Sequence, residues 1–333
     1  MSAATAAICG VVTGYPFDSI KTRMQTYNYS SVWLCTKVTC TEEGLKGLYR
    51  GIMPPLFTIT LTKSLSFSIY ESTKSKIKSL YNPLDPGSLG YIYMASTIAG
   101  GVSGAFIAMF TCPLELVKIQ MQLSQLIHSE RLKRIEFLKN ELTKSKNLNQ
   151  AGNQSYLASL KSLQKMTNYS QSTNLSSKKK ELRNWDSVKY IMRYHGARGF
   201  YSGIGVNLAR DFLGSGLYFG TYEASKSIIK SLFRSEDSGP MIHMLAGGLC
   251  GVFAWSFIFP IDTIKSVYQK NLLAFPGVKQ TYYSCFSSIY FQQGLRGLYK
   301  GVAVTLIRAF PIHALNFTVY EYVRDKISRY CRS

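Results

Sequence analysis

Long apolar runs alternate with polar segments along the chain, and two of the runs carry no charge. Residues 86 to 114 and residues 238 to 261 contain no Asp, Glu, Lys or Arg. About 20 apolar residues suffice for a helix to cross the hydrocarbon core of a membrane. Both runs therefore predict membrane-spanning helices, and a helix buried in a soluble core is the alternative interpretation.

A second set of runs is as long but carries charged residues near the middle. A charge at mid-membrane costs several kcal/mol unless it faces water or a partner. We therefore expect these helices to line a wet cavity, with the uncharged helices sealing it. The runs are 51 to 70, 204 to 222 and 301 to 320, and the charged residues are Lys63, Arg210, Asp211 and Arg308.

A motif of proline, acid, lysine and glutamine closes an apolar run three times, which indicates one unit written three times. Acid and lysine are three residues apart and share a helix face, so three such helices around an axis can close a ring of ion pairs. The glutamines lie one turn further and can brace this proline-motif ring, while the prolines tend to kink the helices and draw their ends together. The copies are Asp18, Lys21 and Gln25 after Pro16; Glu115, Lys118 and Gln122 after Pro113; and Asp262, Lys265 and Gln269 after Pro260.

Two further motifs recur in the same order: a glycine pattern after each proline motif, and a Tyr-Glu motif followed by a base at the end of each charged run. The Tyr-Glu motifs predict a second ring at the other end of the cavity, the tyrosine ring. Two rings that open in turn fit alternating access, and ordinary surface salt bridges are the alternative. The glycine patterns end at Gly51, Gly203 and Gly301; the tyrosine ring comprises Tyr70, Glu71 and Lys74, Tyr222, Glu223 and Lys226, and Tyr320, Glu321 and Arg324.

The repeated motifs predict an all-α membrane protein with six transmembrane helices in three pseudo-symmetric helix pairs. Pro16 lies close to the start of the chain, so the first helix is expected to be short. The stretch between proline motif and glycine pattern is much longer in the middle repeat, from Pro113 to Gly196, than in the first, from Pro16 to Gly44. The extra stretch is polar and basic, and we expect a flexible loop with one helix near 128 to 144. The repeats span 1–82, 83–235 with the insertion at about 124–182, and 236–333.

The net charge of +21 invites a nucleic-acid interpretation, which the distribution of charge does not support. Basic residues lie between the runs and at their ends, without a basic helix or zinc-spaced cysteines to form a binding face. Basic loops are typical of the side of a membrane protein that stays inside. Seven cysteines form no CxxC pair and four histidines form no ligand set, so we expect free thiols, no metal, no cofactor and no enzyme activity.

Together these motifs resemble the mitochondrial carrier family, solute carrier family 25, over essentially all of the chain outside the insertion. The resemblance implies a six-helix bundle that works as a monomer in the mitochondrial inner membrane, with short matrix helices and the insertion in the matrix. The proline-motif ring would be the matrix gate, the tyrosine ring the cytoplasmic gate, and the glycine patterns cardiolipin sites. The family's pairing would join Asp18 to Lys118, Glu115 to Lys265, Asp262 to Lys21, Glu71 to Lys226, Glu223 to Arg324 and Glu321 to Lys74.

The resemblance also places the substrate contacts at Thr58, Arg210 and Arg308, with Asp211 beside Arg210 and Lys63 about one turn from Thr58. Guanidinium groups bind a carboxylate or phosphate with two parallel hydrogen bonds. Asp211 can accept an amino group, or it simply pairs with Arg210.

The residues RAFPIHALNF at 308 to 317 resemble the ornithine and carnitine/acylcarnitine branch of the family. We therefore expect exchange of a small carboxylate-bearing metabolite, either an amino acid or a carnitine-like zwitterion. The acid that ornithine-type carriers use on the second helix has no counterpart, so a di- or tricarboxylate remains an alternative. A non-transporting membrane scaffold or receptor on the same fold is the alternative from another class.

Overall fold

All regular structure in the described part of the chain is helical. The structure is a computed structural model, and it describes residues 2–80, 88–144, 157–165, 167–168, 184–233, 240–275 and 280–308. The long helices are α1 (Ser2–Thr26), α4 (Met53–Leu80), α5 (Leu89–Lys144), α8 (Ile204–Phe233) and α9 (Pro240–Ala274). The shorter ones are α2 (Val32–Glu43), α3 (Leu45–Leu48), α7 (Asn184–Gly199) and α10 (Tyr282–Leu298), and a further helix covers 302–308.

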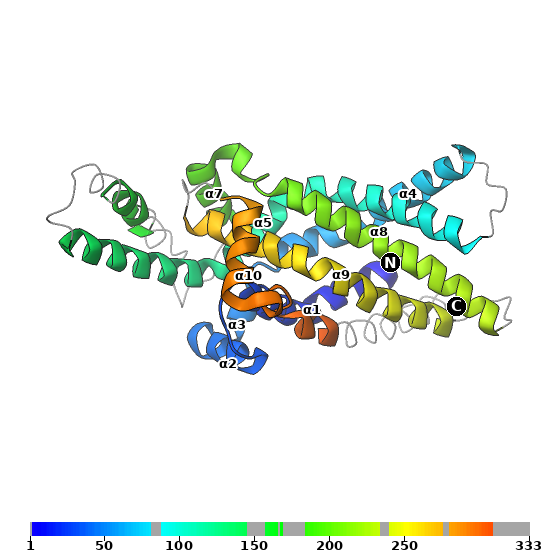
Figure 1. Ribbon diagram of the computed structural model, residues 1–333, viewed down its shortest axis with the longest axis horizontal. Helices are drawn as coiled ribbons and strands as arrows, with labels where there is room; N and C mark the ends of the chain where they lie inside the picture. Colours follow the sequence, from blue (N-terminus) through cyan, green and yellow to red (C-terminus); the bar gives the residue numbers. More distant parts are fainter. Residues whose placement is uncertain are drawn as a thin grey trace, which may run out of the picture.

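The long helices form an elongated bundle, with the short helices gathered toward the end where the proline motifs lie (Figure 1). Helix α8 packs between α5 and α9, and α4 packs on the other side of α5. Small residues allow the close approach of α5 and α8, since a side chain at Gly104 would overlap the backbone oxygen of Asp211 and one at Gly216 would meet that of Thr97. We call the end that contains the proline-motif ring the proline-motif end.

The long helices lie where the apolar runs of the sequence predict them. Within the described ranges two helices, Leu89–Glu141 and Cys250–Ala274, are long and apolar enough to cross a membrane, with mean hydropathies of 1.5 and 1.2. They contain most of the two uncharged runs. Helices α4 and α8 are also long but carry charged residues, Lys63 near the middle of α4 and Arg210 with Asp211 in the first third of α8. Helix α1 is shorter before its proline than α5 and α9 are before theirs.

The glycine patterns form the same turn in each repeat. Each contains two glycines with positive φ, seven residues apart, and each is followed by the start of a helix, α4, α8 or the helix at 302–308. The second glycine of each turn rests on a long helix of the next repeat: Gly51 on Lys118 and Met121, Gly203 on Tyr268 and Gln269, and Gly301 on Lys21 and Met24. The three repeats therefore close in a cyclic order around a common axis.

The first part of the insertion differs from the expected loop. The helix expected near 128 to 144 is present, but α5 runs into it without a break and ends only at Lys144. The reason is an apolar stripe that continues at helical spacing and is buried. Residues 157–165 are helical as well and pack on this stripe. The buried stripe comprises Leu123, Ile127, Arg131, Ile135 and Leu138.

Candidate functional site: a ring of ion pairs below a polar cavity

The proline motifs bring their charged side chains together in one ring. Because acid and lysine lie three residues apart on each helix, each helix presents one acid to a neighbour and one lysine to the other. The pairs are those that the family's pattern implies. Lys21 Nζ lies 2.7 Å from Asp262 Oδ2, Lys118 Nζ lies 3.4 Å from Asp18 Oδ2, and Lys265 forms an ion pair with Glu115.

One of the three expected glutamines braces this ring. Gln25 donates to Asp262 Oδ2 over 2.9 Å and accepts a hydrogen bond of 2.9 Å from Ser266, so it ties α1 to α9 below their ion pair. Gln122 instead donates to Tyr15 Oη over 3.1 Å. Gln269 is fully buried, and its amide makes no hydrogen bond to the residues that the structure describes. The motif thus repeats three times, whereas its brace does not.

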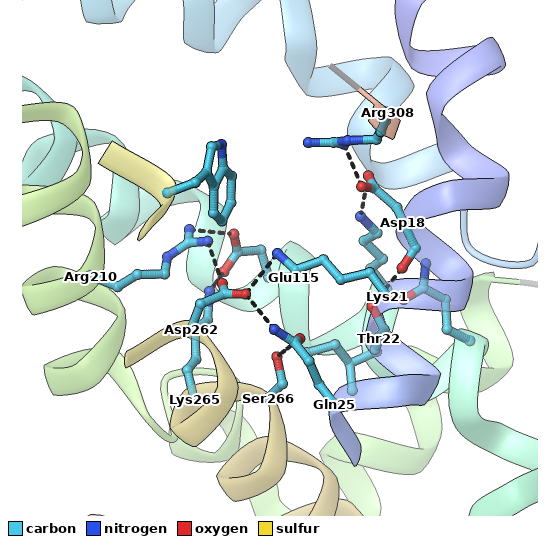
Figure 2. A pocket seen from close by; sticks show the side chains of 14 residues that line it. Asp18, Lys21, Thr22, Gln25, Glu115, Arg210, Asp262, Lys265, Ser266 and Arg308 are labelled. Atoms are coloured by element: carbon cyan, nitrogen blue, oxygen red, sulfur yellow. Dashed lines mark hydrogen bonds and ion pairs between the residues drawn. The ribbon is translucent and has the colours of Figure 1, made fainter. Parts of the chain in front are cut away.

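Two arginines from the charged runs also reach the ring acids (Figure 2). Arg210 on α8 places Nη1 3.2 Å from Asp262 Oδ1 and Nη2 3.3 Å from Glu115 Oε1, and it pairs with its neighbour Asp211. Arg308 pairs with Asp18. Every ring acid therefore binds both a lysine of the ring and an arginine of a helix that lines the cavity.

A cavity of about 220 Å³ lies against this cluster. Five basic and three acidic side chains line it, namely the ring residues and the two arginines. Trp255 on α9 also lines it, with its ring centroid 4.3 Å from Lys21 Nζ, a cation–π distance. The place of Trp255 at the cavity could not be predicted from the sequence, because an aromatic residue in an apolar run gives no sign of whether it faces lipid or cavity.

Two of the expected substrate contacts lie away from this cavity. Thr58 on α4 does not line it and donates to the backbone oxygen of Pro54 over 3.0 Å. Lys63 is exposed and does not line it either. The structure therefore gathers Arg210 and Arg308 at the cavity, with Asp211 in contact through Arg210, and leaves the two α4 residues outside.

The tyrosine ring looks different. Lys74 Nζ lies 3.7 Å from Glu223 Oε2 and donates to Tyr70 Oη over 3.0 Å. This pair is absent from the family's pattern. Over the described ranges no ion pair joins Glu71 to Lys226, so that expected pair is not formed in this structure. Lys74 and Glu223 are 32% and 23% exposed, so the pair is looser than those of the proline-motif ring. Tyr222 lies on α8 one residue before Glu223, and Tyr320, Glu321 and Arg324 lie outside the described residues.

A buried ion pair that the motifs did not indicate supports the first repeat. Arg23 follows Lys21 by two residues and makes a two-pronged contact with Glu43, at 2.7 and 2.9 Å. Arg50 joins the same carboxylate at 3.2 Å, and Arg23 also donates to the backbone oxygen of Gln122. The sequence offered one signal, since the acid that opens the glycine pattern is present only in this repeat, the others having His195 and Gln293.

A helical bundle with charged side chains around a cavity is typical of a membrane transport protein, and comparison with known proteins identifies its family. The family model described as mitochondrial carrier protein matches residues 1–80, 91–144, 162–232 and 236–330. The chain belongs to this family, so it is a multi-pass transporter of the mitochondrial inner membrane.

Relatives with transporter names extend over nearly the whole chain. A mitochondrial ornithine transporter of Schizosaccharomyces pombe is 31% identical over 96% of this chain and 89% of the relative. A mitochondrial arginine transporter of Arabidopsis thaliana is 27% identical over 94% and 86%. A mitochondrial carnitine carrier of Saccharomyces cerevisiae is 27% identical over 97% and 85%. The ornithine and carnitine branch expected from the sequence is confirmed.

Proposed function

We propose that this carrier exchanges a small amino acid or a carnitine-like zwitterion by alternating access through six membrane spans. The proline-motif ring is the matrix gate and the tyrosine ring is the cytoplasmic gate. The observation that carries the proposal is the closed ring at one end beside a looser pair at the other. This difference is expected of a carrier closed toward the matrix. One chain completes the proline-motif ring, so the monomer is the transporting unit.

The substrate carboxylate binds Arg210 and Arg308. Both guanidinium groups line the cavity, and each is held there by ring acids that a substrate carboxylate can replace. The amino or ammonium group of the substrate has two partners within reach of the same region. These are the carboxylate of Asp211, which Arg210 releases, and the face of Trp255, which attracts cations. The names of the ornithine, arginine and carnitine relatives support a substrate with both charges.

Binding and gate opening are coupled through the shared arginines. A carboxylate that takes the Arg308 guanidinium removes one partner of Asp18, and one that takes Arg210 removes a partner of Glu115 and of Asp262. Each partly buried pair contributes on the order of 1 to a few kcal/mol. Substrate therefore lowers the cost of opening the ring at the moment when it occupies the cavity.

A dicarboxylate is a second candidate, which the charge of the cavity favours. Five basic against three acidic lining residues leave an excess of positive charge that suits a dianion. The acid that ornithine-type carriers use on the second helix has no counterpart here, since Thr62 and Lys63 occupy that neighbourhood.

The glycine turns are proposed lipid sites. Gly51, Gly203 and Gly301 each lie just before a helix, and the dipole at a helix N-terminus favours phosphate. Cardiolipin, with two phosphates, fits such turns.

Uptake by purified protein in liposomes tests the proposal. Liposomes are loaded with ornithine, arginine, carnitine or a dicarboxylate, and entry of the labelled solute is measured for the wild type, Arg308→Ala and the exposed control Arg134→Ala. We expect exchange of a zwitterion that Arg308→Ala lowers at least tenfold and Arg134→Ala leaves unchanged. Exchange of dicarboxylates alone supports the second candidate. If no solute exchanges, or if Arg308→Ala exchanges at the normal rate, the proposed site is wrong.

A further inference from the structure

The part of α5 beyond the proline-motif ring contacts both of the other helices that carry ring residues. Helices α1 and α9 end a few turns beyond their prolines, at Thr26 and Ala274, whereas α5 continues more than twice as far beyond Pro113, to Lys144. At 1.5 Å per residue, the stretch from residue 126 to 144 adds roughly 27 Å of helix. Figure 1 shows this stretch leaving the bundle on the left. Its first turns carry a cluster of charged contacts that lies outside the ring.

Glu130 joins all three helices through one carboxylate. Lys270 Nζ on α9 lies 3.0 Å from Oε1 and 3.1 Å from Oε2. Tyr27, directly after the end of α1, donates to Oε2 over 2.9 Å. Lys270 also lies over the Tyr27 ring, 4.9 Å from its centroid. The side chain of Lys270 is only 9% exposed and that of Glu130 29%, so water screens the pair less than at an open surface.

Arg131 binds the end of α9. Its Nε donates to the backbone oxygen of Ala274 over 2.9 Å, and Nη2 donates to the backbone oxygen of Leu273. The last carbonyls of a helix lack partners within the helix and attract positive charge, and α9 has no basic residue in its own last turn. Arg131, 1% exposed, supplies that charge from α5, and Nη2 also donates to Tyr190 Oη on α7.

Apolar contacts hold the extension in this position. Leu123 and Ile127 belong to one buried cluster with Leu273 and Ala274 of α9 and with Tyr190 and Ile191 of α7. Ile135 and Leu138 form another with Leu160 and Leu163. Phe275, just past the end of α9, packs against both clusters. The extension is thus packed on the bundle in its first turns and on residues 157–165 further out.

We infer that Glu130 and Arg131, with Tyr27 and Lys270, form a latch that holds the proline-motif end closed in addition to the ring. The ring and the latch connect the same three helices. When α1 and α9 separate from α5, the carboxylate of Glu130 cannot keep both of its partners, so the latch must break in every transport cycle. The inference rests on the proposed alternating access, because only a carrier that opens at this end has to break these contacts.

The rate at which a buried cysteine is alkylated can measure how often the proline-motif end opens, if that cysteine is exposed only when this end is open. Gln269 on α9 is one turn beyond Lys265 and directly before Lys270, and it is fully buried with no hydrogen bond to the described residues. In Gln269→Cys, alkylation of residue 269 by a membrane-impermeant maleimide is measured in liposomes by peptide mass spectrometry, which separates it from the native cysteines. Ser266→Cys, also buried, serves as a second reporter.

We expect Glu130→Gln to raise the alkylation rate about fivefold, as loss of a partly buried, hydrogen-bonded ion pair implies. Lys270→Met gives the same rise, and the double variant adds little, because the two residues share one interaction. Tyr27→Phe raises the alkylation rate about twofold. The matched control is Glu136→Gln, an exposed residue on the same helix, which leaves the rate unchanged. Melting temperatures confirm that each variant is folded.

The exchanged pair Glu130→Lys with Lys270→Glu separates a latch from a general packing role. It restores the ion pair, so slow alkylation returns, whereas lost packing would not be repaired. A wild-type rate in Glu130→Gln, or fast alkylation in the exchanged pair, overturns the inference. The proposed function has its own readout in the liposome uptake: if no solute is exchanged but Glu130→Gln still exposes residue 269, the latch stands and the proposed exchange fails.

Discussion

Gln25 provides a direct measure of what one brace contributes to the ring. Its amide donates to the Asp262 carboxylate and accepts from Ser266, both at 2.9 Å. A hydrogen bond to a charged group contributes about 1.5 to 3 kcal/mol. Gln25→Met keeps the volume of the side chain and removes both interactions. We therefore expect a loss of about 2 kcal/mol in the free energy of unfolding, which lowers the melting temperature by about 4 °C in a chain of this size.

The third copy of the motif supplies the control. Gln269 occupies the same place after Pro260, is buried, and has an amide without hydrogen bonds to the described residues. Gln269→Met removes a buried amide that makes no hydrogen bond to the described residues, so the free energy of unfolding should stay the same or rise slightly. Thermal unfolding of both variants in lipid nanodiscs, followed by tryptophan fluorescence, gives the comparison. Equal shifts for the two variants, or no shift for Gln25→Met, would refute the assignment of the brace.

Further expectations concern backbone strain, substrate binding and pH. Gly51 has φ +81°, and a methyl group added there would lie within 3.2 Å of three neighbouring atoms, whereas Gly294 has φ +64° and open space. Chemical denaturation should therefore show that the free energy of unfolding falls by about 3 kcal/mol in Gly51→Ala and by about 1 kcal/mol in Gly294→Ala. Arg308→Lys keeps the charge but loses the two-pronged donor, so the KM for uptake rises about tenfold. Burial, followed by a nearby guanidinium, lowers the pKa of His128 and His195. As pH falls below about 6.5, the unfolded chain therefore takes up protons before the folded one does. The melting temperature should decrease from pH 7.5 to pH 5.5, and it should decrease less steeply in a variant with both histidines changed to Gln.

The ring could be predicted from the sequence because it depends only on spacing. Acid and lysine three residues apart share a helix face wherever the helix lies, and threefold repetition supplies the neighbours. The same reasoning failed for the braces, since whether Gln25 or Gln269 finds a partner depends on the register between helices. Nothing in the motif encodes that register.

The tyrosine ring and the insertion show two other limits. The pairing of Lys74 with Glu223 depends on how far the helices lie apart at that end, which the motif does not specify. The helix near 128 to 144 was expected, but its continuity with the helix of the proline motif was not, because the composition of this stretch is polar. Its buried stripe, at spacings of three or four residues, includes Arg131. A prediction from the spacing of apolar residues alone ends the buried stripe at Arg131. This arginine can be buried because the carbonyl groups at the end of α9 accept hydrogen bonds from it.

Substrate bound at the shared arginines and the latch act on the same equilibrium in opposite directions. In the proposed cycle, substrate competes for Arg210 and Arg308 and so weakens the ring from the cavity side, but it has no contact with Glu130 or Arg131. The latch therefore adds a cost of opening that substrate does not offset, and a variant without it opens more often whether or not substrate is bound. Loss of the latch should then raise the rate of opening in the empty carrier by the same factor as in the loaded one, whereas Arg308→Ala, which leaves Arg210 in place, should reduce the difference between empty and loaded carrier. The two variants thus separate the part of gating that responds to substrate from the part that does not.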